Sequence, residues 1–205
     1  MPKRDINQID SMHYDVLKEI GNIGAGNATT ALSTMINSKI DMEVPKVALL
    51  EFKDLADAVG GAETIVVGIL ITLEGEINGI MMFMMEEVSA YRLVNILMGR
   101  PIDQIDNFSE MEHSALKEIG NIIAGAYLSS LSTLTGIRID ASIPYMAIDM
   151  SGAIISVPAI EFGKVGDKAL IIETEFFKDD IDVNGYFILI PSIESYDVIL
   201  TSLGL

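Results

Sequence analysis

The sequence contains no cysteine and only two histidines, His13 and His113. Without cysteine the chain has no disulfide, no thiolate metal ligand and no cysteine nucleophile. The two histidines do not align in the internal repeat described below, and no metal-ligand spacing surrounds either of them. We therefore expect no metal site and no Ser-His-Asp triad, and we assign both histidines to ordinary surface or helix-start positions.

Basic residues are also scarce. The chain has 13 Lys and Arg against 30 Asp and Glu, which gives a formal net charge of −17 and a pI near 4.3. Such a surface is a poor match for nucleic acid or for an anionic membrane. A basic, lysine-presenting or metal-loaded partner suits it better, although a charge that only confers solubility would look the same.

Long hydrophobic runs are missing as well. The longest, 65–73 and 80–85, have the length of a strand and fall far short of the roughly 18 residues of a membrane span. No apolar signal core follows the basic start MPKRDINQID. We expect a cytoplasmic protein without a membrane span. Hydrophobic residues still make up 50% of the chain, which is enough for a substantial core.

An internal repeat organises the chain. The segment LKEIGNIGAGN at 17–27 returns as LKEIGNIIAGA at 116–126, and the offset of 99 residues holds without a gap up to Pro45 and Pro144. Repetition at a fixed offset indicates a duplicated structural unit. Each half alone would have a small core, so the two halves are expected to share one sheet.

Hydrophobic periodicity and turn residues predict the elements of each half. Glu74-Gly75 is expected to turn a hairpin, and Gly99 and Gly136 to end helices. The predicted elements of the first half are a helix over 5–37, strands over 40–52, 64–73 and 76–85, and a helix over 86–98. Those of the second half are a helix over 110–135, strands near 144–149, 153–162, 168–177 and 184–191, and a helix over 193–203.

These elements predict an α+β fold. It would be a pseudo-two-fold tandem duplication of an α-β-β-β-α unit, with helices packed on a shared, mainly antiparallel sheet. The expected organisation is a single domain over residues 1–205, made of a first half (1–105) and a second half (106–205).

Three glycines, Gly21, Gly24 and Gly26, interrupt the first predicted helix. The run GNIGAGN superficially resembles a glycine-rich phosphate loop. It lies inside a helix, lacks the Lys-Ser/Thr of such loops and reads GNIIAGA in its second copy, so we reject that interpretation. Each glycine costs a helix about 0.5–1 kcal/mol relative to alanine. We assign the three to close packing.

A polar stripe on the first predicted helix is the candidate site. Asp15, Glu19 and Asn22 stand at i, i+4 and i+7 and therefore share one face. A solvated helix face would look the same. An Asn amide, however, can hold a water through one donor and one acceptor, and a Glu can pair with a cation.

The second copy presents the same spacing in Ser114, Glu118 and Asn121. Glu and Asn are kept in both copies, whereas Gly24 becomes Ile123. A carboxylate and an amide cannot supply covalent catalysis, but they can position groups. Hydrolysis of an already activated phosphoryl bond needs mainly an aligned water and charge neutralisation, and the metal can belong to the partner.

At these residues the sequence resembles the CheC/CheX/FliY family of chemotaxis phosphatases. The family pattern is Asp or Ser, then Glu, then Asn, then a distant Pro. Both copies meet it, ending at Pro45 and at Pro144. The likeness covers essentially the whole chain. Two copies in a chain of this length resemble the branch of the family that lacks an added C-terminal switch domain.

The resemblance implies an activity and two partners. The substrate would be phosphorylated CheY, a response regulator that carries an aspartyl phosphate and a magnesium ion; no cofactor of the chain's own is implied. Asn22 and Asn121 would orient the attacking water, and Glu19 and Glu118 would pair with the regulator's active-site lysine. Asp15 and Ser114 would be supporting contacts.

The second implied partner is the receptor deamidase CheD, with Asp149 as a contact residue; a turn position at a strand end is the alternative for Asp149. We expect the protein to act as a monomer. The competing hypothesis is a non-catalytic adaptor that binds CheD or docks at the flagellar switch. Loss of either Asn would have favoured the adaptor, and both are present.

Overall fold

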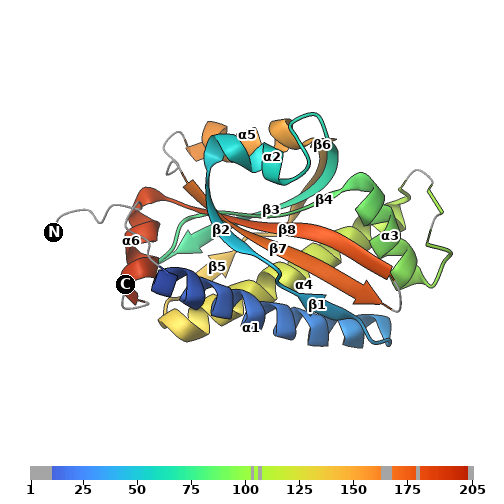
Figure 1. Cartoon of the computed structure of the whole chain (residues 1–205), viewed down its shortest axis with the longest axis horizontal. Coiled ribbons are helices and arrows are strands. Elements are labelled where there is room, and N and C mark those ends of the chain that lie inside the picture. Colours follow the sequence, from blue (N-terminus) through green and yellow to red (C-terminus); the bar gives the residue numbers. More distant parts are fainter. Residues whose placement is uncertain (1–10, 103, 106–107, 163–167, 179–180, 203–205) are drawn as a thin grey trace.

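The protein is described by a computed structural model over residues 11–102, 104–105, 108–162, 168–178 and 181–202. Within these residues an antiparallel sheet lies between two helical layers (Figure 1). The first half contains α1 (Ser11–Ile36), β1 (Asp41–Glu43), β2 (Val47–Glu51), η2 (Phe52–Asp54), α2 (Leu55–Ala58), β3 (Ile65–Gly75), β4 (Gly79–Glu86) and α3 (Glu87–Met98). The second half contains α4 (Glu110–Thr135), β5 (Ile139–Ala141), β6 (Tyr145–Met150), α5 (Ser151–Phe162), β7 (Lys168–Lys178), β8 (Ile181–Pro191) and α6 (Ile193–Ser202).

The two halves exchange strands. The sheet order is β1-β7-β8-β4-β3-β5, with β2 also beside β7 and β6 also beside β3, and all pairs are antiparallel. Strands β1 and β2 of the first half therefore pair with the second half, and β5 and β6 of the second half pair with the first. The prediction of an α+β fold with a shared antiparallel sheet is confirmed.

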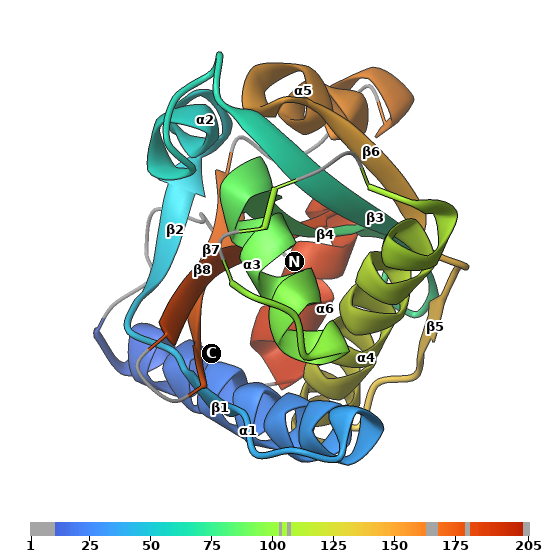
Figure 2. The same cartoon turned by 90° about the vertical axis from the view of Figure 1, so that its right-hand side faces the viewer.

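Each face of the sheet buries its own core. On one face, side chains of α1, α3, α4 and α6 pack against residues such as Ile69, Phe83 and Phe187. On the other face, α2 and α5 pack against residues such as Met82 and Ile188. Figure 2 shows α2 and α5 together on the side of the sheet opposite α1. Successive strand residues point to opposite faces, so strands covered on both sides read as continuous apolar runs.

Helix ends match the capping signals in the sequence. Helix α4 has the predicted bounds and ends at Gly136 with φ +71°, and α3 ends at Gly99 with φ +63°. Both glycines adopt the left-handed conformation that terminates helices. Helix α1 begins at Ser11. The predicted helical residues 5–10, and residue 203 of the last predicted helix, lie outside the described residues.

Two predicted strands and one predicted turn were wrong in detail. Residues 153–162 were predicted to be a strand but belong to α5; their apolar run suits either structure, and Ile154 and Ile155 pack against the sheet from outside it. The predicted strand 40–52 is divided into β1 and β2 around Pro45. The hairpin turns at 76–78 and not at Glu74-Gly75. Each half has four strands and one further helix, α2 or α5, whereas the predicted α-β-β-β-α unit has three strands. Four strands were predicted along the second half, but the one at 153–162 is replaced by β5 (Ile139–Ala141).

The helical glycines have two different environments. A Cβ on Gly120 would lie 2.5 Å from Ile69 of β3, and one on Gly24 would lie 2.5 Å from the Tyr127 ring. Gly21 is in ordinary contact with Val44 of the β1–β2 connection. Packing explains these three. It does not explain Gly26, or its counterpart Gly125 in α4: both are exposed, and a Cβ on either would meet nothing within 4 Å.

This contrast predicts opposite effects of the same substitution. Gly120→Ala would push against buried Ile69 and should destabilise the fold by about 1–2 kcal/mol, because overpacking outweighs the helix-propensity gain. Gly125→Ala should stabilise it by about 0.5–1 kcal/mol. Urea denaturation of the two variants tests this; equal shifts in the same direction would contradict the packing role of Gly120.

Candidate functional site on helices α1 and α4

The predicted stripe on α1 is exposed. Asp15, Glu19 and Asn22 all face solvent, whereas Leu17 and Ile20 between them are buried in the core. The helix is continuous through these positions, so the three polar side chains share one face. The structure therefore brings together the three residues that the spacing predicted for the first site.

The stripe on α4 has the same exposure. Ser114, Glu118 and Asn121 face solvent, and Leu116 and Ile119 are fully buried. The Ser114 hydroxyl donates a hydrogen bond to the Glu110 carbonyl, 2.9 Å away, within its own helix. The second copy thus offers an uncharged side chain, already held by the backbone, where the first offers the Asp15 carboxylate.

Helices α1 and α4 lie side by side in one layer and run in opposite directions (Figure 1). The Asn27 side-chain amide donates to the Ser130 hydroxyl across the pair at 3.3 Å. The Tyr127 ring occupies the space beside Gly24 and stacks on Phe187 of β8, with ring centroids 4.3 Å apart. The two stripes are therefore fixed to a common layer.

Each stripe is followed 23 residues after its Asn by a proline, Pro45 or Pro144, and the structure shows what surrounds Pro45. Pro45 lies in the connection from β1 to β2, between Val44 and Lys46. Val44 of this connection and Val47, the first residue of β2, approach Gly21, the residue before Asn22. The connection therefore supports the helix directly beside its candidate Asn.

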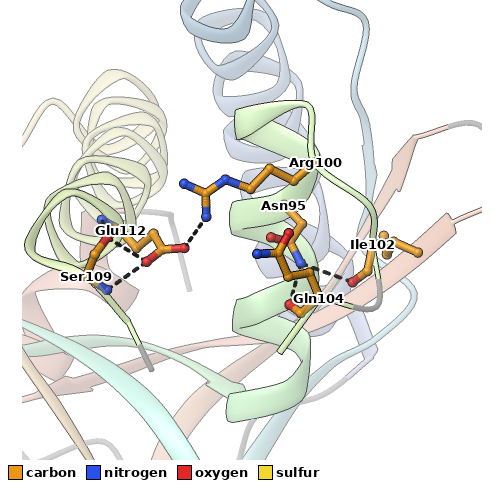
Figure 3. Close-up of polar contacts among 6 residues, drawn as sticks. All are labelled: Asn95, Arg100, Ile102, Gln104, Ser109 and Glu112. Carbon is orange, nitrogen blue, oxygen red and sulfur yellow. Dashed lines mark hydrogen bonds and ion pairs between the residues drawn. The ribbon is translucent and has the colours of Figure 1, made fainter. Parts of the chain in front are cut away.

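A polar network fixes the start of α4 (Figure 3). The Glu112 carboxylate accepts hydrogen bonds from the Ser109 backbone N–H at 2.7 Å and hydroxyl at 2.6 Å, while the Glu112 N–H donates to the Ser109 hydroxyl. This reciprocal pair is a capping box. Arg100, just after α3, contacts the other oxygen of Glu112 at 2.6 Å. These bonds lower the pKa of Glu112, those from Ser109 first.

The connection from α3 to α4 is held by a second set of contacts. The buried Asn95 amide donates to the carbonyls of Ile102 and Gln104, at 3.2 and 2.8 Å (Figure 3). The rings of Tyr91 and Phe108 stack with centroids 3.9 Å apart. The internal repeat did not point to Glu112, because the first copy has His13 at the equivalent position and no carboxylate.

The remaining candidate, Asp149, does not join the stripes. It is exposed near the end of β6, paired in register with Val66 of β3, and accepts a hydrogen bond from the Met150 N–H at 2.7 Å. Helix α5, which follows at once, belongs to the opposite layer from α1 and α4. The structure therefore separates Asp149 from both stripes.

In the described part of the chain, no group of three or more His, Asp or Glu side chains could hold a metal ion. Among the same residues, no helix is long and apolar enough to cross a membrane. His113 lies beside the Phe108 ring, with centroids 5.8 Å apart, whereas the side chain of His13 lies outside the described residues.

The family model described as CheC-like matches residues 12–49 and 111–144, which are the two copies of the repeat. A relative from Bacillus subtilis, the CheY-P phosphatase CheC, is 37% identical over 97% of this chain and 97% of its own length. The chain belongs to the CheC-like family. Another relative, the putative CheY-P phosphatase CheC1 of Halobacterium salinarum, is 25% identical over 95% of this chain and 98% of its own.

A solved structure gives the same picture of the CheC-like fold. Thermotoga maritima FliY superposes with a TM-score of 0.76 at 22% identity, over 96% of this chain and 98% of that chain. At this level of identity the likeness concerns the fold alone.

The capping box makes stability depend on pH. Because the folded pKa of Glu112 is lowered from its ordinary 4.5, its contribution is complete above that value and is lost as pH falls through the folded pKa. In Glu112→Gln the amide keeps the capping geometry but removes the charge. The stability difference from wild type should be present at pH 7 and should shrink below pH 4.5, as measured by urea denaturation.

The matched control is Glu110→Gln, an exposed carboxylate in the same turn of α4 that lies outside the network. At pH 7 its free energy of unfolding should differ less from that of wild type than the free energy of Glu112→Gln does. A Glu112→Gln difference that stays constant down to pH 3 would contradict the role of the carboxylate.

Proposed function

We propose that this protein hydrolyses the aspartyl phosphate of a phosphorylated CheY response regulator. The observation that carries the proposal is the pair Glu and Asn, exposed at the same spacing on two adjacent helices. The relationship to CheC of Bacillus subtilis, a CheY-P phosphatase by name, supports it over nearly the whole chain. Each stripe is complete within one chain, so the activity needs no second copy.

Asn22 and Asn121 orient the attacking water in this proposal. An amide accepts one hydrogen bond and donates another, so it fixes the water in direction as well as in position. The water oxygen bonds to phosphorus as the bond to the aspartyl oxygen breaks. The electron pair leaves on the regulator's carboxylate, and the water proton leaves with inorganic phosphate. Both Asn side chains project from rigid helices, which suits a positioning role.

Glu19 and Glu118 hold the regulator. Each lies one turn before its Asn, is exposed and can accept a charge-assisted hydrogen bond from the regulator's active-site lysine. Asp15 and Ser114 lie one turn further back as supporting contacts. Since Asp15 is charged and Ser114 is neutral, the two sites differ in electrostatic strength.

The magnesium ion belongs to the regulator in this proposal. When bound there, it neutralises phosphoryl charge. The phosphatase itself supplies an amide and a carboxylate on a surface that enters the regulator's site, without a cofactor of its own.

A second function, binding of the receptor deamidase CheD, has a separate surface to support it. Asp149 is exposed on β6, whose other edge has no partner among the described strands. Ile143 and Tyr145, at the start of the same segment, are 89% and 69% exposed. An open strand edge with apolar and acidic side chains suits a protein partner. This surface is distinct from the stripes, so binding and hydrolysis can coexist.

Substitution of the Asn residues tests the phosphatase proposal. Asn22→Ala and Asn121→Ala should each remove one site and leave the other, whereas the double variant should slow phospho-CheY decay by about 100-fold or more, because the water is no longer aligned. The measurement is the loss of radiolabelled phosphate from CheY. Unchanged decay in the double variant would sink the phosphatase assignment and leave the adaptor.

For the second function, Asp149→Lys should weaken co-elution with CheD in size-exclusion chromatography, since it reverses a charge on the exposed edge. It should leave phospho-CheY decay unchanged. A matched control is Asp57→Lys, at an exposed position of α2. If the Asp149→Lys variant co-elutes with CheD as wild type does, Asp149 is not part of the interface.

A further inference from the structure

The helical surroundings of the two Asn residues are identical. Residues three and four positions away on a helix are the neighbours of a given side chain. For Asn22 these neighbours are Lys18, Glu19, Ala25 and Gly26, and for Asn121 they are Lys117, Glu118, Ala124 and Gly125. The duplication therefore keeps a cation beside each Asn as well as the carboxylate.

Both lysines are exposed, and neither forms an ion pair with another described residue. The structure describes five lysine side chains, and three of them hold a carboxylate: Lys39 with Asp41 at 2.7 Å, Lys46 with Glu173 at 3.1 Å and Lys53 with Glu51 at 2.6 Å. The two without an ion pair among the described residues are Lys18 and Lys117. In a chain of net charge −17, these two cations lie beside the two candidate sites without a carboxylate partner in the part of the chain that the structure describes.

A cation at this place would add to the charge neutralisation that the regulator's magnesium ion supplies. A phosphoryl group brings negative charge to the Asn, and the charge spreads over its equatorial oxygens in the transition state. The neighbouring Glu19 or Glu118 would by itself repel that charge. A lysine one turn before the Asn has its Cβ about 5–6 Å away, and its four-carbon stem lets the ammonium reach the group that the shorter amide contacts.

We propose that Lys18 and Lys117 are further catalytic residues whose ammonium groups contact the phosphoryl oxygens of the bound regulator. This inference rests on the proposed phosphatase function. The lysine supplies charge stabilisation and the Asn supplies the aligned water, while the carboxylate holds the regulator. One turn after each Asn, Gly26 or Gly125 carries no side chain, and a Cβ placed there would meet nothing within 4 Å. That end of the site is therefore open to the regulator.

The test is steady-state hydrolysis of phospho-CheY by the double variant Lys18→Gln/Lys117→Gln. Removal of one charged donor from a transition state lowers the rate, and we expect kcat to fall about 10- to 100-fold. Lys18→Arg/Lys117→Arg keeps both charges and should retain kcat within about threefold. The matched control is Lys39→Gln/Lys53→Gln, which removes the same net charge elsewhere and should leave kcat unchanged.

The outcomes separate the inference from the function on which it rests. An unchanged kcat with a raised, salt-sensitive KM would overturn it, since the lysines would then only assist association. An unchanged kcat and KM would overturn it too. If, in parallel, Asn22→Ala/Asn121→Ala abolishes hydrolysis, the phosphatase function stands without the lysines. If wild type does not accelerate decay at all, the function falls and the lysine role falls with it.

Discussion

The exchange of strands between the two halves is the constraint on which the rest of the structure depends. Strand β7 is bordered by β1 and β2 from the other half, and β3 is bordered by β5 and β6 from the other half. Backbone donors and acceptors at these borders are satisfied only when both halves are folded. The helices follow the same exchange: Gly21 of α1 packs near Ile172, and Gly120 of α4 packs against Ile69.

This arrangement explains why a duplicated helix carries two candidate sites on one layer. Burying one face of α1 and of α4 against the sheet leaves the opposite face of each in solvent, and the polar stripes occupy those faces. The regulator of the proposed function would approach with an acidic, phosphorylated site, so the distribution of lysines on this layer matters for that proposal. The chain uses three described lysines in internal ion pairs and leaves two beside the Asn residues.

The two halves are not equivalent in every respect. Helix α4 begins with a capping box tied to Arg100, and the α3–α4 connection is held by Asn95. The α3–α4 connection joins the two halves and occurs once in the chain, so the contacts that hold it have no counterpart in the repeat. The same holds for α5, a twelve-residue helix where the first half has the four-residue α2. The partner surface proposed at Asp149 lies in the half that contains α5.

The sequence alone determined what local chemistry controls. Gly99 and Gly136 predicted the ends of α3 and α4. The 99-residue offset located both stripes, because helical spacing places i, i+4 and i+7 on one face. Only the tertiary structure decided which strands pair, that 153–162 is a helix, and which helical glycines pack. Those features depend on contacts between residues far apart in the sequence, such as Gly24 with Tyr127, and a packed sheet can override the preference of an apolar run.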